Sequence, residues 1–370
     1  MKKSVRYIIM SMVVLMGLTI SNAFAGNKDR SGQAGASELL INPWAASSGW
    51  GNAGMAMVRG TEAIWGNVAG TTDINKFDFT FSNTFWLSGL NSHINLMSFG
   101  LMVKIKEVNT IGFSFVNFSL GEVPITTVEH PEPYGLGTYK PSLMNINVSF
   151  ARKFSNSISG GLVVKIINER ISDMGATGVA FDAGIQYVTG PTENIHFGIT
   201  LKNIGPTMKF SGDGLSIKAF LQGSSNQITV IQRADQFEMP AQLNIAAAYD
   251  FNIGKEEDAK TYHRITIAGD FTSNSFTNDQ FILGLEYGFE PYLKIRAGYT
   301  FEKGIFSKGG IKNASCMNIN RGLSAGLSVD VPLTKKTEEK PNQVKLGIDY
   351  SYRDTYVFGG SHSIGLRILF

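Results

Sequence analysis

The chain has 370 residues, a formal net charge of +3, and charged side chains at only 17% of its positions. A nearly neutral chain with dispersed charge argues against nucleic-acid binding. The single cysteine, Cys316, excludes an intrachain disulfide, and we interpret it as a buried or loop thiol rather than a nucleophile.

Residues 1–25 have the features of a secretory signal peptide. Three cations precede an apolar run over residues 7–20, and a small-x-small cleavage site ends at Ala25. The apolar run is short for a membrane span. These cations account for the net charge, so the chain after Ala25 is neutral.

Residues 26–75 are rich in alanine and glycine and show no period-two alternation. If the rest of the chain is a membrane barrel, this segment cannot face lipid, because its backbone groups would be unpaired there. We expect a plug or hatch inside the lumen or against its periplasmic mouth. The candidate plug residues are Trp44, Trp50, Trp65 and Asn67. The alternative is a disordered leader, which the bulky tryptophans argue against.

Apolar and polar residues alternate from residue 76 to residue 370, as in the runs 77–85, 144–150 and 243–251. Past the signal peptide we find no apolar run of about 18 residues, so no transmembrane helix is expected. The alternation predicts about fourteen strands, each near the ~9–11 residues that cross a membrane. We therefore predict an all-β fold, a transmembrane antiparallel β-barrel over residues 76–370. A large soluble β-sandwich is the alternative.

The last stretch of the chain supports the barrel. It places Phe358, Ile364, Leu366, Ile368 and Phe370 on one face. The last strand of an outer-membrane barrel must pair with the first to remove both edges. The terminal phenylalanine also resembles the C-terminal signal that the barrel-assembly machinery reads.

The predicted loops alternate between long and short. Those after odd-numbered strands, at residues 121–141, 170–178, 203–240 and 302–318, are expected to face outward. Those after even-numbered strands are mostly short and are expected to face the periplasm, with both chain ends. This asymmetry is typical of outer-membrane barrels.

Parity places several polar strand residues inside the barrel. They are Asp182, Gln186, Lys294, Arg296, Asp349 and Arg353. We expect them to pair with one another in a hydrated lumen, and a permeation path is the alternative. The five histidines show no metal-ligand spacing, so we predict no catalytic centre, metal site or cofactor.

The N-terminal segment resembles the PorV/PorQ family of the FadL-like superfamily. Residues 31–41 are similar to that family's opening "G-x-A-G-A-x-x-L-L-I", and residues 63–70 to its "W-N-P-A-G" stretch. Here Gly66 separates Trp65 from Asn67, and Val68 replaces the proline. Weaker similarity continues to about residue 301.

The resemblance implies a fourteen-stranded barrel integral to the outer membrane of a Bacteroidetes-type bacterium. The PorV branch serves the type IX secretion system. It binds the C-terminal signal domains of cargo, docks beside the large translocon barrel, and shuttles cargo to the surface. The implied partners are those proteins and outer-membrane lipid, and the implied protein is not an enzyme.

The two longest loops suit protein recognition, because they carry apolar residues rimmed by charge. The candidate partner-binding residues are Val123, Ile125, Tyr134, Tyr139, Phe210 and Phe220. The loops could also merely shield the barrel. Two other functions stay open: a FadL-like transporter of hydrophobic small molecules with the N-terminal segment as its gate, and a porin-like or structural barrel.

Overall fold

The computed structural model describes residues 30–90, 94–133, 135–220, 226–254, 262–303, 316–334, 344–355 and 359–370. The predicted signal peptide, Tyr134 and Phe358 lie outside these residues. Within them, no helix is both long enough and apolar enough to cross a membrane.

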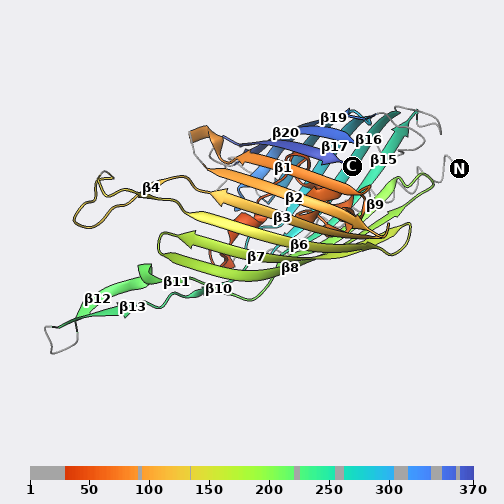
Figure 1. Ribbon diagram of the computed structural model, residues 1–370. Helices are drawn as coiled ribbons and strands as arrows, with labels where there is room; N and C mark the ends of the chain where they lie inside the picture. Colours follow the sequence, from red (N-terminus) through yellow and green to blue (C-terminus); the bar gives the residue numbers. More distant parts are fainter. Residues whose placement is uncertain are drawn as a thin grey trace.

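Fourteen antiparallel strands form a closed barrel, which confirms the predicted fold class (Figure 1). The strands are β1 (Phe77–Phe85), β2 (Asn95–Ile105), β3 (Asn109–Ser119), β6 (Ser142–Lys153), β7 (Ile158–Ile171), β8 (Met174–Thr189), β9 (Ile195–Ile204), β15 (Gln242–Ile253), β16 (Tyr262–Asn274), β17 (Gln280–Glu290), β18 (Leu293–Glu302), β19 (Asn320–Pro332), β20 (Lys345–Thr355) and β21 (Ser361–Leu369). The ring closes because β21 pairs with β1, with Leu366 opposite Phe81. No strand of the ring is left as an edge.

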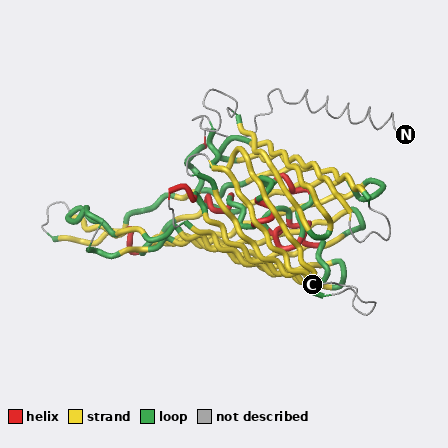
Figure 2. The backbone as a smooth tube through the Cα atoms, turned by 90° about the horizontal axis from the view of Figure 1, so that it is seen from above, coloured by secondary structure: helices red, strands yellow, loops and turns green. Residues whose placement is uncertain are grey.

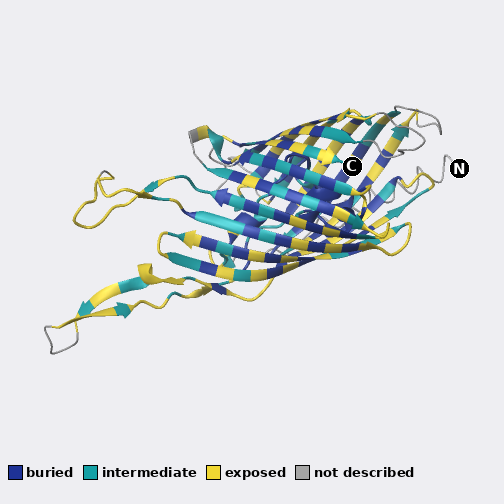
Figure 3. Ribbon diagram, in the orientation of Figure 1, coloured by how far each residue is buried: buried dark blue, intermediate teal, exposed yellow. Residues whose placement is uncertain are grey.

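Period two decides which side chains face outward. Along β17, Phe281, Leu283 and Leu285 are about half exposed, while Gln280, Ile282 and Glu286 between them are buried. Figure 3 shows the same alternation along the neighbouring strands. An apolar outer surface with a polar interior is what a barrel in lipid requires.

The two ends of the barrel differ. At the end where β1 begins and β21 ends, the turns are short, such as Ser155–Ser157 and Pro291–Tyr292; we name it the short-turn end. The opposite, long-loop end carries two arms, which project beyond the strands in Figure 1. The first arm, residues 120–141, contains β4 (Val123–Pro124) and β5 (Thr138–Tyr139).

The second arm spans residues 205–241. Its elements are β10 (Met208–Lys209), β11 (Ser211–Gly212), η7 (Asp213–Leu215), β12 (Ser216–Phe220), β13 (Gln227–Ile231) and β14 (Gln236–Phe237). β12 and β13 form a separate two-stranded hairpin, whereas β11 pairs with the outer end of β8.

The expected loop over residues 170–178 is wrong. β7 and β8 pair as far as Ile171 and Met174, so only a two-residue turn connects them. Ser172 and Asp173 form this turn, and the residues on either side of them belong to β7 and β8. The polar and glycine residues of the stretch therefore do not mark where these strands end.

Residues 30–75 lie inside the ring of strands (Figure 2). The short helices of this N-terminal segment are η2 (Ser37–Leu40), α2 (Ala45–Ser48), η3 (Ala53–Ala56), η4 (Gly60–Ile64) and η5 (Val68–Thr72). They touch strands all around the ring. Arg30 lies at the long-loop end against Phe276, while the carbonyl of Ile74 accepts from Lys104 at the short-turn end. The segment thus runs the length of the barrel.

Candidate functional site

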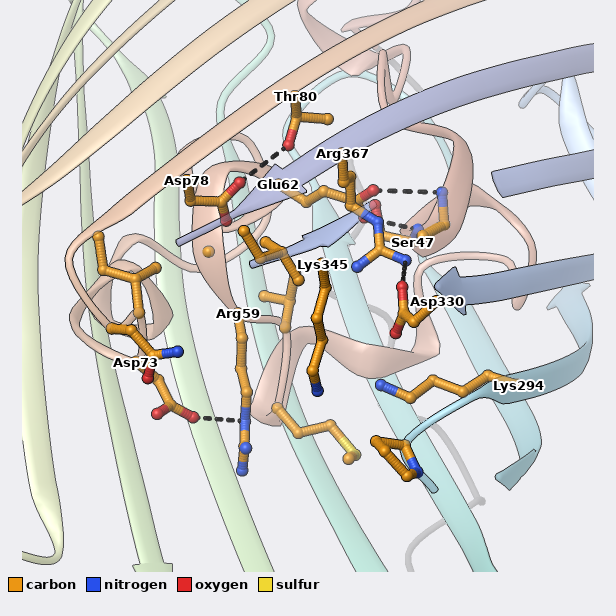
Figure 4. A pocket seen from close by; sticks show the side chains of 18 of the residues that line it. Ser47, Arg59, Glu62, Asp73, Asp78, Thr80, Lys294, Asp330, Lys345 and Arg367 are labelled. Atoms are coloured by element: carbon orange, nitrogen blue, oxygen red, sulfur yellow. Dashed lines mark hydrogen bonds and ion pairs between the residues drawn. The ribbon is translucent and has the colours of Figure 1, made fainter. Parts of the chain in front are cut away.

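A cavity of about 400 Å³ lies at the short-turn end, between the N-terminal segment and the barrel wall. Residues 57–62 and 73–75 form one side of it. The other side comes from β1, β16, β17, β18, β19, β20 and β21. Figure 4 shows charged side chains of both sides pointing into this space.

The wall of the cavity is held by ion pairs between inward-facing side chains. Glu286 lies directly across from Arg296 on the next strand, and their side chains meet at 2.6 Å. Arg264 approaches the same carboxylate at 2.5 Å and that of Glu290 at 2.9 Å. Such buried charges require partners, because removal from water is costly for an isolated ion.

A second set of ion pairs centres on Arg367 of β21. Its Nε lies 2.6 Å from Asp349 Oδ2, and its Nη2 lies 3.0 Å from Asp330 Oδ1. These residues belong to the last three strands of the chain, so the pairs tie β19, β20 and β21 together on the lumen side.

Two further carboxylates, Glu62 of the N-terminal segment and Asp78 of β1, accept hydrogen bonds from backbone N–H groups of that segment. Glu62 accepts hydrogen bonds from the backbone N–H groups of Ala46 (3.2 Å) and Ser47 (2.7 Å). The N–H of Thr61 donates to Asp78 of β1 at 3.0 Å. Burial, followed by the nearby Asp349 carboxylate, raises the pKa of Glu62 above its ordinary value.

All six polar residues that parity assigned to the lumen point inward, although Lys294 remains partly exposed. Asp182 pairs with Lys165 at 2.6 Å. Others bind the N-terminal segment instead of one another: Gln186 donates to the carbonyls of Met55 (3.3 Å) and Val58 (3.2 Å). The charges therefore fix the internal segment as well as the wall.

The four candidate plug residues lie inside the barrel. Trp44 and Asn67 are fully buried, and Trp50 is 5% exposed. Asn67 donates to the carbonyl of Ile185 at 3.0 Å. Trp65 is half-buried, with the ammonium of Lys202 3.3 Å above its ring centre.

The candidate partner-binding residues fall into two groups. Ile125 and Phe220 are 37% and 66% exposed, and Val123 faces Tyr139 across the neck of the first arm. Phe210 instead packs on Phe237, with ring centres 5.6 Å apart. Phe210 is half-buried in this contact within the second arm.

Sequence reasoning missed the cluster around Glu286 and Arg264. Both residues alternate with outward apolar residues of their strands, so the sequence could have predicted that they point into the lumen. The ion pairs that they form could not be predicted, because these depend on the register between neighbouring strands. In the described part of the chain, no group of His, Cys, Asp and Glu side chains is arranged to hold a metal ion.

Comparisons with known proteins identify a fold but no family. No protein-family model and no curated protein matches the chain. Among solved structures, the CymD monoaromatic hydrocarbon channel is similar with a TM-score of 0.51 and 12% identity, over 89% of this chain and 97% of that one. This chain therefore has the closed antiparallel barrel fold of that channel's structure.

Two further structures are similar at lower scores. The Pseudomonas putida toluene transporter TodX gives a TM-score of 0.48 with 11% identity, over 89% of this chain and 97% of that one. A Pseudomonas aeruginosa FadL homologue gives 0.47 with 10% identity, over 88% and 96%.

Proposed function

We propose that this FadL-like barrel is a component of the type IX secretion system that binds proteins at its long-loop end. In this proposal it resembles the PorV branch, lies in the outer membrane of a Bacteroidetes-type bacterium, and binds cargo signal domains or the translocon barrel. The observation that carries the proposal is the second arm, whose hairpin reaches beyond the barrel (Figure 1) and carries exposed apolar side chains.

The hairpin face is built from cross-strand pairs. Ile217 lies opposite Val230, and Ala219 lies opposite Ile228. Ile217 and Ile228 are 48% and 37% exposed. A two-stranded hairpin is marginal in water without a further layer to cover its apolar side. A partner protein would supply that layer, and the free strand edges could accept an added strand.

The filled lumen favours binding of a protein at the outside of the barrel over passage of a solute through it. The N-terminal segment occupies the barrel from one end to the other, and it is held both by hydrogen bonds to the strands and by apolar packing against them. The cavity at the short-turn end is lined largely by charged groups. Neither feature favours an apolar solute.

The test is a mild-detergent purification of the tagged protein from its native outer membrane, with mass spectrometry of what co-purifies. Wild type should bring along a very large barrel or secreted proteins that share a C-terminal domain. The double substitution Ile217→Ser and Ile228→Ser should reduce that recovery at least about tenfold, as expected for loss of buried apolar contacts. The double substitution Lys218→Ser and Thr229→Ser, which removes no apolar side chain from the hairpin, should leave it unchanged. Equal recovery in both, or a lone barrel from wild type, would contradict the proposal.

A second candidate function is passage of hydrophobic small molecules with the N-terminal segment as a gate. The observation that favours it is the fold shared with CymD, whose structure is described as a monoaromatic hydrocarbon channel. It predicts that organic extraction of the purified barrel releases a stoichiometric hydrophobic compound. A barrel that carries such a compound and no protein partner would establish this function instead.

A further inference from the structure

The cavity at the short-turn end contains two lysines, one with a long ion pair and one with none. Among the described residues, Lys345 forms no ion pair, and Lys294 Nζ lies 3.7 Å from Glu290 Oε1. That oxygen is already 2.9 Å from Arg264. Figure 4 shows both lysine side chains extending into the same part of the cavity.

The other charges of the cavity are matched within the protein. Each of its four arginines has a carboxylate partner, in the pairs Arg59–Asp73, Arg264–Glu286, Arg296–Glu286 and Arg367–Asp330. Glu62 and Asp78 accept hydrogen bonds from backbone N–H groups. The lining holds six cationic and six carboxylate side chains. Within this balanced frame, the ammonium groups of the two lysines extend into the open volume (Figure 4).

We propose that this cavity binds a small organic anion, whose carboxylate or phosphate group lies between Lys294 and Lys345. Two ammonium groups that share one space repel each other, and an anion between them replaces that repulsion with charge-assisted hydrogen bonds. The volume of about 400 Å³ is within the range of small-molecule sites. Leu369 also lines the cavity, on the same face of β21 as Arg367, and offers an apolar surface to the body of such a ligand.

The site is distinct from the protein-binding face. It opens at the short-turn end, opposite the two arms, and it uses none of their residues. Its ligand would therefore enter from the periplasmic side of the barrel in the orientation expected from the sequence. Loss of partner binding at the arms would leave this site intact, and the converse also holds.

The test is isothermal titration calorimetry of the full-length mature protein in detergent micelles, with succinate and inorganic phosphate as separate probes. Saturable binding of succinate alone would identify a carboxylate site, and saturable binding of phosphate would identify a phosphate site. Lys345→Gln and Lys294→Gln should each weaken binding at least about tenfold, because each removes a charge-assisted hydrogen bond. Lys153→Gln should have no effect, since Lys153 is an exposed lysine at the same end but outside the cavity.

A second variant separates ligand binding from simple damage to the fold. Lys345→Glu puts a carboxylate in place of one of the two ammonium groups, so it repels an anionic ligand. It should abolish binding, while heat-modifiable gel mobility shows a barrel that is as folded as wild type. Absence of saturable binding of both probes to wild type would overturn the proposal. Equal affinities for wild type, Lys345→Gln and Lys153→Gln would overturn it as well.

Discussion

At the scale of single residues, glycine decides how closely the internal segment can approach the wall. A Cβ on Gly298 would lie 2.3 Å from the carbonyl oxygen of Trp50, and a Cβ on Gly326 would lie 2.8 Å from the Cα of Gly49. Both distances involve backbone atoms, which cannot rotate away. The glycines on the lumen face are therefore where the strands make room for the segment.

We expect Gly298→Ala to destabilise the folded barrel by about 1–3 kcal/mol, the usual cost of forcing extra volume into a packed interior. Heat-modifiable gel mobility across a temperature series would measure the change. Gly269→Ala is the matched control, because the nearest atom to a Cβ there is 3.7 Å away. Equal effects of the two substitutions would show that the approach of Trp50 does not matter.

Glu286 is the residue that holds the largest share of the wall charges together. It bridges Arg264 and Arg296, from the strands on either side of β17. Glu286→Gln leaves the buried guanidinium of Arg296 with a neutral partner and Arg264 with Glu290 alone, so we expect a loss of roughly 3–5 kcal/mol of stability. Denaturant unfolding followed by tryptophan fluorescence would measure it. Glu193→Gln, at an exposed turn, should change nothing; a stable Glu286→Gln barrel would mean that these pairs contribute little.

At the scale of elements, the second arm is joined to the outer end of the N-terminal segment. Gly35 N–H donates to the carbonyl of Glu238 at 3.0 Å, and Arg30 pairs with the Glu238 side chain. The ring of Phe237 lies on Gly35, where a Cβ would be 2.1 Å from it. The arm that we propose to bind partners is thus in direct contact with the segment that fills the lumen.

Glu38 makes the docking of this segment sensitive to pH. Burial raises the pKa of Glu38 to about 8, and the Glu169 carboxylate adds to the rise. Lys165 lines the same small cavity. Because this pKa is higher in the folded protein than its ordinary value of 4.5, stability falls as pH rises through that interval and levels off above about 8.

We therefore expect the wild-type melting temperature to fall as pH rises from about 5 to about 8, between the ordinary and the raised pKa of Glu38. Glu38→Gln should largely remove this dependence, whereas Glu122→Gln, on the exposed first arm, should keep it. Parallel profiles for wild type and Glu38→Gln would assign the titration to another group.

The elements differ in how far the sequence could predict them. Each of the fourteen strands follows from its alternation, because one face meets lipid and the other the lumen. The hairpin of β12 and β13 lies in a stretch that looked like a polar loop. Because β12 and β13 lie outside the barrel, neither lipid nor a core requires their apolar and polar residues to alternate. They are strands only because they pair with each other. The inward packing of Phe210 on Phe237 depends on the fold of the arm and has no local signal.

At the scale of the whole molecule, the barrel is closed twice, around its wall by the pairing of β21 with β1 and along its axis by the N-terminal segment. The number of strands and the side chains that face the lumen could be predicted from the sequence. The path of the segment could not, because it depends on contacts such as that of Asn67 with Ile185, 118 positions away. The outside of the barrel and its two mouths are then the surfaces available for function.

The most direct test of this account is the conductance of the purified full-length mature protein in planar lipid bilayers. Because the N-terminal segment fills the lumen, we predict no sustained channel current from this protein. A variant that lacks residues 31–72, verified as folded by heat-modifiable gel mobility, should give stable open channels. Sustained current of the same size from both proteins would contradict the central claim, because it would mean that the internal segment does not close the barrel.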